Sequence, residues 1–240
     1  MTMTEQEAKR DIAIASRILA GEKILDAFGH VSCRHPDRPD RFLIPRALAP
    51  ALVTPSDVLE LDFLGAAVSA PGALVFLERF LHAEIYRRRP DVQSIVHSHA
   101  MAVLPFTVTP TARMRPICHM CGFLHGAPAP FDVADHAGSS SNLLIGNSQL
   151  GVALATHLGE ASVVLMRGHG YTAVGSSIPV ATYRAVYTAR NCEQQLSALA
   201  LGEPIYLSEG ECEAADAAAM SQIRRPWDLW LQTYAPEFET

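Results

Sequence analysis

The 240-residue sequence lacks any apolar run that approaches the roughly 20 residues needed to cross a bilayer. Its first residues, MTMTEQE, are polar and acidic, without the basic-then-apolar order of a secretory signal peptide. Internal repeats, low-complexity segments and obvious linkers are also missing. We therefore expect a cytoplasmic protein that folds as a single domain over residues 1–240, with residues 206–240 as a C-terminal extension.

Positive charge is scarce as well. There are 19 Lys and Arg residues against 25 Asp and Glu residues, which gives a formal net charge of −6. This balance argues against a general nucleic-acid binder. Apolar residues make up 49% of the chain and the mean hydropathy is +0.12, so the chain has the composition of a globular protein with a buried core.

Cysteine is limited to five residues, an odd number that suggests free thiols in a cytoplasmic chain. Cys118 and Cys121 form a CxxC pair, but no second CxxC exists to complete a four-cysteine zinc site. The flanking proline and glycine favour a loop over a redox or zinc-knuckle role.

Hydrophobic periodicity predicts alternating helices and strands. We expect helices at residues 5–20, 77–89, 150–158 and 178–201, and a short helix after residue 99 that Pro105 ends. We expect strands at residues 29–34, 41–45, 58–62, 94–99, 161–166 and 171–175. The simplest arrangement of these elements is one α/β domain with αβα layers.

The most informative motif is His97-Ser98-His99, at the end of an apolar run. Side chains of a strand alternate between its two faces, so His97 and His99 are expected on one face and Ser98 on the other. Two imidazoles side by side on a rigid strand can hold a divalent metal.

A metal site needs more ligands. His169 follows a second buried strand and is bracketed by Gly168 and Gly170, which permit a tight turn and close approach of an ion. Glu78, expected one turn into the helix before the His97 strand, offers a carboxylate that could bind the metal or move protons. Each residue alone has an ordinary structural interpretation, so the hypothesis depends on their joint occurrence.

In combination, five segments resemble the class II aldolase/adducin superfamily. They are residues 29–32 (GHVS), the Glu78-x-x-x-His82-x-x-x-Tyr86 pattern, residues 89–92 (RPDV), residues 96–100 (VHSHA) and residues 167–170 (RGHG). The resemblance implies a three-layer αβα fold around a central, mainly antiparallel sheet. It also implies one divalent metal per subunit on His97, His99 and His169, with Glu78 as fourth ligand or acid/base, and no organic cofactor.

The resemblance further implies a homotetramer with active sites at subunit interfaces, where residues 206–240 would pack. No nucleic acid or membrane partner is expected. Three imidazoles and a carboxylate suit Zn²⁺ or Mn²⁺, while Co²⁺ or Fe²⁺ would also fit.

The chain departs from the sugar-phosphate aldolases of this superfamily where they bind phosphate. His30 stands at an Asn position, Arg46 lies in the region of a Thr-Gly turn, and Phe76-Leu77 replaces a Ser-Ser pair. A phosphate dianion buried without hydrogen-bond donors would be costly, so an aromatic body with charged substituents fits better. His30, Ser32, Arg46 and Phe76 are the candidate substrate contacts, and an exposed Arg46 is the alternative.

A second departure is His119, in a loop where the phosphate aldolases carry a tyrosine that protonates from a neighbouring subunit. Histidine titrates near neutrality, so His119 could be a proton donor, and a structural loop histidine is the alternative.

These departures point to the branch of metal-dependent decarboxylases that act on hydroxylated aromatic or pyridine carboxylates in aromatic compound catabolism. Three segments resemble that branch: residues 26–32 (DAFGHVS), residues 48–54 (LAPALVT) and the His119-Met120-x-Gly122-Phe123 pattern. Its members include 3-hydroxy-2-methylpyridine-4,5-dicarboxylate 4-decarboxylase and the dihydroxyphthalate decarboxylases. Such a lyase would break a carbon–carbon bond with a Lewis acid stabilising the enolate or phenolate, and Glu78 or His119 would supply the proton. The alternatives are an aldolase or epimerase for a non-phosphorylated hydroxy-carbonyl substrate, and a non-catalytic interaction protein.

Overall fold

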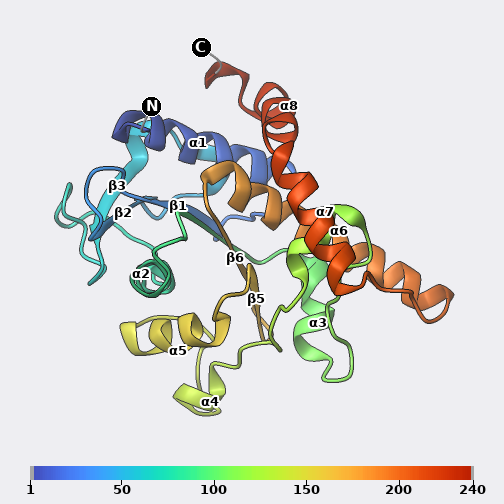
Figure 1. The fold of residues 1–240 in the computed structure, drawn as a ribbon. Helices are drawn as coiled ribbons and strands as arrows, with labels where there is room; N and C mark the ends of the chain where they lie inside the picture. Colours follow the sequence, from blue (N-terminus) through green and yellow to red (C-terminus); the bar gives the residue numbers. More distant parts are fainter. Residues whose placement is uncertain (1–2, 239–240) are drawn as a thin grey trace.

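The computed structural model describes residues 3–238 and places a six-stranded sheet between two layers of helices (Figure 1). The strands are β1 (His30–Arg34), β2 (Arg41–Pro45), β3 (Val58–Asp62), β4 (Ser94–Ser98), β5 (Val163–Met166) and β6 (Gly170–Gly175). Their order is β3-β2-β1-β4-β6-β5, and each neighbouring pair is antiparallel. The predicted αβα fold with a mainly antiparallel sheet is confirmed.

Helices cover both faces of this sheet. They are α1 (Glu5–Gly21), α2 (Arg79–Arg88), α3 (Leu104–Val108), α4 (Ala134–Ala137), α5 (Ser148–Leu158), α6 (Ile178–Leu201), α7 (Glu209–Ser221) and α8 (Arg224–Tyr234). In Figure 1, α1 and α6 lie on one side of the strands, and α2 and α5 lie on the other. Each layer encloses its own apolar core, so the sheet is buried on both faces.

Alternation along β4 decides which layer each side chain meets. Val96 belongs to the core with α1 and α6, and Ile95 belongs to the core with α2 and α5. His97 follows Ile95 by two residues and is fully buried on the same side. Ser98 points the other way, and its hydroxyl donates to the carbonyl of Ile24.

Two local expectations are corrected. Helix α2 begins at Arg79, so Glu78 occupies the position before the helix rather than one turn inside it. Pro105 lies in the first turn of α3 and does not end a helix. The first-turn amides have no intrahelical acceptor, so proline costs nothing there.

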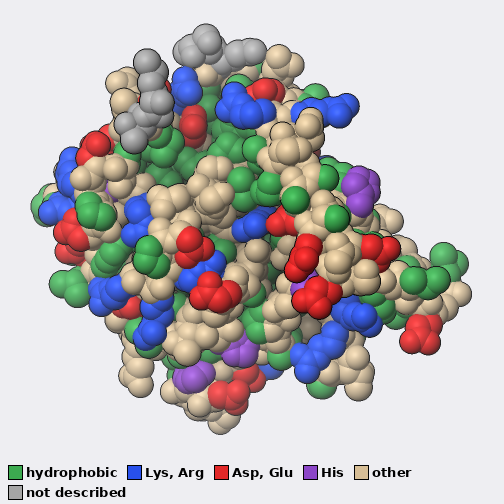
Figure 2. All heavy atoms as spheres, viewed as in Figure 1, with side chains coloured by type: hydrophobic (Ala, Val, Ile, Leu, Met, Phe, Trp, Pro, Cys, Tyr) green, Lys and Arg blue, Asp and Glu red, His purple; other side chains and the backbone are tan. Residues whose placement is uncertain are grey.

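The C-terminal extension packs on its own chain. Helix α7 lies against the 3-10 helix His119–Leu124, and α8 contacts α1 and α6 through the buried rings of Trp227 and Trp230. Acidic side chains gather over α7 on the face shown in Figure 2, as expected from its sequence. A role for this extension at a subunit interface stays a prediction. Within residues 3–238, no helix is both long enough and apolar enough to span a membrane.

Candidate metal centre

Four side chains from three parts of the fold converge on one point: Glu78, His97, His99 and His169. The Nε2 atoms of the three histidines lie 3.0–3.1 Å from one another. Oε2 of Glu78 lies 3.2 Å from Nε2 of His97 and 3.3 Å from Nε2 of His169. The four residues that the sequence hypothesis combined therefore lie together in the folded chain.

Glycine brings His169 to the end of β4. Gly168 has a φ of +63°, a left-handed conformation that most side chains disfavour. At Gly170, a Cβ atom would lie only 2.1 Å from the carbonyl oxygen of Ser98. The turn between β5 and β6 can thus pass directly beside the segment that carries His97 and His99.

The outer nitrogen of each histidine has an oxygen partner. Nδ1 of His169 donates to the carbonyl of Leu143 at 2.9 Å, and a carbonyl can only accept. Nδ1 of His97 lies 3.3 Å from Oγ1 of Thr172, whose hydroxyl contacts the Met166 sulfur. Nδ1 of His99 lies 3.3 Å from a carboxylate oxygen of Asp26. A proton on Nδ1 leaves a lone pair on Nε2, so three lone pairs point into the cluster.

These donors fit a divalent metal ion. Neutral imidazoles with converging lone pairs repel one another unless a cation lies between them. Ligand bonds of about 2.0–2.1 Å in tetrahedral geometry would separate the donor atoms by about 3.4 Å. Five of the six separations, at 3.0–3.3 Å, are close to that value, and all four donor atoms lie within 4.8 Å of one another. The second carboxylate oxygen of Glu78 accepts the backbone N–H of Ile145 at 2.9 Å, which fixes its orientation.

The protonation states agree with this role. Burial by itself would raise the pKa of Glu78, but His97 and His169 outweigh it and hold that pKa far below its usual range. Burial, reinforced by His97 and His169, lowers the pKa of His99 to about 4. Burial lowers the pKa of His169, but the Glu78 carboxylate outweighs burial and raises it. The cluster therefore offers an ionised carboxylate and a neutral His99 near neutral pH, and binding of an ion would release the proton that Glu78 favours on His169.

A cavity of about 570 Å³ opens beside the cluster. Glu78 and His99 line it together with His30, and the other lining residues are apolar: Ala27, Phe28, Ala47, Leu48, Ala49, Val75, Phe76, Leu77 and Leu144. Phe28 and Leu77 are 71% and 66% exposed, so this apolar wall is accessible from solvent.

Of the predicted substrate contacts, the structure brings two to the cavity. His30 and Phe76 line it, with ring centroids 4.4 Å apart. Ser32 is fully buried, and its hydroxyl contacts the side chains of His82 and Tyr86. Arg46 is not among the lining residues, because its guanidinium is half-exposed and pairs with Asp57 at 2.8 Å.

His119 also lies outside this cavity. It is exposed on the 3-10 helix against α7 and lines a separate cavity of about 470 Å³ with Tyr183, Tyr187 and residues of α7 and α8. Within one chain, the structure does not bring His119 to the residues of the metal centre.

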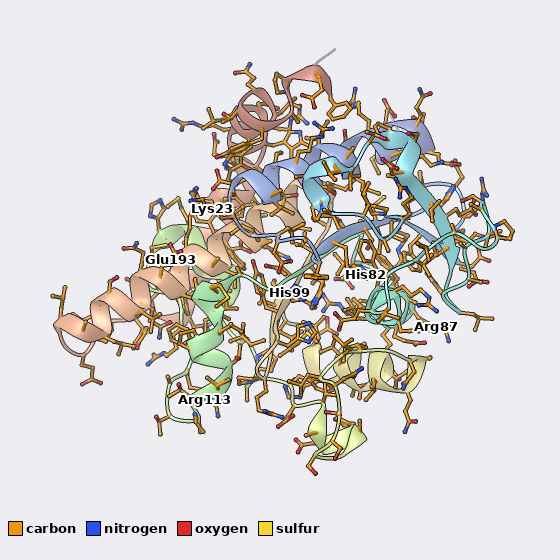
Figure 3. All side chains as sticks on the ribbon, turned by 180° about the vertical axis from the view of Figure 1, so that it is seen from behind. Lys23, His82, Arg87, His99, Arg113 and Glu193 are labelled. Atoms are coloured by element: carbon orange, nitrogen blue, oxygen red, sulfur yellow. The ribbon has the colours of Figure 1, made fainter. Side chains whose placement is uncertain are left out.

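Sequence reasoning missed the residues that orient the ligands. Asp26 and Thr172 have no motif of their own, and Leu143 contributes only a backbone carbonyl. His82 and Tyr86 were noticed only as part of a family pattern, although their four-residue spacing from Glu78 predicts one face of a helix. Figure 3 shows His82 on α2, close to the middle of the molecule where His99 also lies.

Comparison with known proteins agrees with this architecture. The family model for the class II aldolase and adducin N-terminal domain matches residues 10–196. The chain is 40% identical over 238 residues to the decarboxylase tropJ of Talaromyces stipitatus, covering 90% of this chain and 89% of that protein. It is 31% identical over 221 residues to a 3,4-dihydroxyphthalate decarboxylase of Terrabacter sp., with 88% of each covered.

Among solved structures, the L-fuculose 1-phosphate aldolase of Glaciozyma antarctica superposes with a TM-score of 0.78. The two chains are 22% identical, and the match covers 98% of this chain and 93% of the aldolase, which supports the fold. The chain belongs to the class II aldolase and adducin family, and it is an enzyme of the lyase type with decarboxylases among its relatives.

Proposed function

We propose that this enzyme is a divalent-metal-dependent decarboxylase of a hydroxylated aromatic or pyridine carboxylate. The similarity to proteins named as decarboxylases, over about nine-tenths of the chain, supports the reaction type. The four converging donors support metal dependence, and Zn²⁺ or Mn²⁺ suits them.

The substrate class is inferred from the apolar wall of the 570 Å³ cavity beside the metal centre, called the metal-side cavity below. Of its lining residues, only His30, Glu78 and His99 have polar side chains, and neither Lys nor Arg is among them. A phosphate dianion would find too few donors there, whereas an aromatic ring would contact Phe76, Leu77 and Leu144. The cavity thus favours a flat, apolar body whose charged groups point at the metal centre.

The reaction consumes one proton. The bond between the ring and the carboxylate breaks, CO₂ leaves, and the ring carbon takes up a proton in its place. A divalent ion supplies a Lewis acid for the oxygen next to that carbon. The surrounding side chains exclude water and hold the ring in place.

Glu78 is the carboxyl group that lines the cavity, so we assign to it the proton delivery. Its low pKa in the free protein favours the ionised ligand form before substrate arrives. Once substrate oxygens occupy the cavity, Oε2 would take up a proton from solvent and pass it to the ring carbon as CO₂ leaves, which returns Glu78 to its ionised form, while Oε1 stays held by the Ile145 amide.

We further propose a homotetramer in which His119 of one subunit serves the cavity of a neighbouring subunit. His119 is exposed and lies outside the metal-side cavity of its own chain, so it can take part only across an interface.

The test is a direct assay of CO₂ release. The metal-loaded protein, without oxidant or organic cofactor, is incubated with 3,4-dihydroxyphthalate and a panel of other ortho-hydroxy aryl carboxylates. We expect one CO₂ per molecule of decarboxylated product, and loss of the activity in the Glu78→Gln variant. Retro-aldol cleavage of a non-phosphorylated hydroxy-ketone, with no CO₂ from any panel member, would instead identify an aldolase.

A further inference from the structure

A chain of four buried side chains runs from α2 through β1 to the metal-side cavity. The Tyr86 hydroxyl lies 2.8 Å from Oγ of Ser32, and that oxygen lies 2.6 Å from Nδ1 of His82. Nε2 of His82 lies 2.7 Å from Nδ1 of His30. All four residues are at most 3% exposed, and His30 alone among them lines the cavity.

The hydrogen bonds of this chain run in one direction. In the part of the protein that the structure describes, Ser32 Oγ is the hydrogen-bond partner of the Tyr86 hydroxyl. A buried hydroxyl hydrogen without an acceptor is costly, so Tyr86 donates to Ser32. The single hydrogen of Ser32 must then go to Nδ1 of His82, which leaves the hydrogen of neutral His82 on Nε2.

The direction of these hydrogen bonds also determines which nitrogen of His30 carries hydrogen at the cavity. His82 donates from Nε2 to Nδ1 of His30, so neutral His30 carries its hydrogen on Nε2. Both rings are buried, and Nδ1 of His30 must accept the one hydrogen shared at 2.7 Å with Nε2 of His82, which requires a lone pair there. Among the described residues, Nε2 of His30 has no hydrogen-bond partner, although the residue is only 3% exposed and borders the cavity.

We propose that Tyr86, Ser32 and His82 act as positioning residues that hold His30 as an Nε2–H donor, and that this donor receives an anionic oxygen of the substrate. This inference rests on the proposed function for the identity of the oxygen, a carboxylate or phenolate. The directional chain prevents His30 from presenting a lone pair, so it also selects against substrates with an N–H or ammonium group there.

Position in the sheet supports this role. His30 and His97 are paired residues of β1 and β4, and their ring centroids lie 5.1 Å apart. The donor therefore lies beside the metal centre, where one substrate could contact both.

The first experiment measures the direction of the chain without any substrate. Long-range ¹H–¹⁵N correlation spectra of the Zn²⁺-loaded, histidine-labelled protein identify which ring nitrogens carry hydrogen. His30→Leu and His82→Leu spectra assign the signals. We expect hydrogen on Nε2 of both His30 and His82, and hydrogen on Nδ1 of His30 would overturn the inference.

The second experiment measures what the donor binds, with 2-hydroxybenzoate and 2-hydroxybenzamide as probes for calorimetry on the Zn²⁺-loaded protein. We expect the wild type to prefer the benzoate, and His30→Leu to reduce this preference about tenfold, the loss expected for one hydrogen bond to a charged group. An unchanged ratio, or failure of the benzoate to bind the wild type, would refute the substrate contact.

Matched variants separate positioning from folding. His82→Gln keeps one acceptor and one donor, so it should restore most of the preference that His82→Leu loses. Tyr86→Phe should weaken the preference for the benzoate. Tyr171→Phe should leave it unchanged, because it removes a buried hydroxyl that donates to the Ala185 carbonyl, outside the chain of side chains that ends at His30. Equal effects of the two tyrosine variants would refute the positioning role. Absence of CO₂ release with the tautomer and probe results intact would refute only the proposed function.

Discussion

The ring of His169 shows how one backbone contact decides the chemistry of a side chain. Its Nδ1 hydrogen goes to the Leu143 carbonyl, so its Nε2 lone pair is available to an ion. Leu143 itself has a φ of +63°, an uncommon conformation for a leucine, and this conformation places its carbonyl beside the ring.

Removal of a ligand should abolish metal binding. We expect His169→Ala to lose its bound metal after dialysis, and Asp26→Asn to bind it about 10–100-fold more weakly because His99 loses its carboxylate partner. Elemental analysis and competition with a chelating dye measure both effects. His157→Ala, an exposed histidine whose ring contacts the Ala129 carbonyl, is the control and should keep its metal. Full metal content in His169→Ala would show that the metal does not bind at the cluster of Glu78, His97, His99 and His169.

Cys118 is a second residue with unusual chemistry. A hydrogen bond from the Cys121 thiol, 3.1 Å away, lowers the pKa of Cys118 to about 6, helped by the backbone amides of Met120 and Cys121. The thiolate is the reactive form, so Cys118 should react with iodoacetamide at pH 7 and lose most of this reactivity below pH 6.

Mass spectrometry of the alkylated protein checks this expectation. Burial raises the pKa of Cys33 and of Cys192, so these two thiols should stay unmodified in the folded protein. A Cys118 alkylation rate that does not change between pH 5 and pH 7 would contradict the shift.

At the scale of elements, the metal centre depends on how closely α2 and α5 pack. Gly151 of α5 faces α2, and a Cβ atom there would lie 2.6 Å from the carbonyl oxygen of Phe80. The loop before α2 carries Glu78, and α2 itself carries His82. The spacing of α2 and α5 therefore affects the positions of both the metal ligand Glu78 and the hydrogen-bonded His82.

Gly151→Ala should therefore destabilise the protein, although alanine is the better helix former. We expect a loss of about 1–3 kcal/mol in the free energy of unfolding, as for other overpacked interiors, together with weaker metal binding. Gly210→Ala is the matched control, because a Cβ atom at that helical glycine meets nothing within 4 Å. It should stabilise by about 0.5–1 kcal/mol. Urea unfolding measures both, and a stabilised Gly151→Ala would show that the two helices can move apart freely.

Local signals account for the elements that the sequence predicts well. The strands at residues 41–45 and 58–62 and the helix at residues 178–201 have the expected bounds, since turn residues and caps mark their ends. The start of α2 was wrong by two residues, because no strong cap precedes Arg79. Pro105 was misassigned because proline is compatible with a helix start as well as with a helix end.

The site divides in the same way. The four metal donors were predictable because a His-x-His pair, a histidine between two glycines and a nearby glutamate seldom occur together in one sequence by chance. The pairing of Arg46 with Asp57 depends on how β2 pairs with β3, and the bond from His82 to His30 depends on how α2 packs against β1. Arg46 and Asp57 are 11 positions apart and His30 and His82 are 52 apart, and neither separation leaves a periodic pattern in a sequence.

At the scale of the whole molecule, metal binding should be coupled to stability. The four donors come from segments that meet only in the folded chain, so an ion bound there stabilises the folded state. With free Zn²⁺ at about 100 times Kd, the stabilisation is about 2.7 kcal/mol, or about 5–10 °C in Tm for a chain of this size.

Calorimetry with and without a chelator measures this difference. The chelator should lower Tm, and added Zn²⁺ should restore it. The His97→Ala variant should show no response to either treatment, and a chelator effect of equal size in that variant would place the stabilising ion elsewhere.

The proposed tetramer also has a whole-molecule test. Glu78→Gln and His119→Ala subunits, each expected to be inactive alone, would carry complementary defects if His119 acts across an interface. Denaturing the two together and refolding them should restore a fraction of the CO₂ release. A mixture that stays inactive, or a monomeric mass by light scattering, would contradict this arrangement.

The antiparallel register of the sheet has a consequence for folding. His30, His97 and Thr172 stand opposite one another on β1, β4 and β6. A slip of one residue between β1 and β4 would turn His30 to the far face of the sheet, and a slip of β4 against β6 would take Thr172 away from His97. His97 and His99 belong to the β4 segment and His169 precedes β6, so an ion held by all three binds chains in which β4 and β6 are correctly aligned. Metal present during refolding should therefore raise the yield of chains with the native β4–β6 pairing.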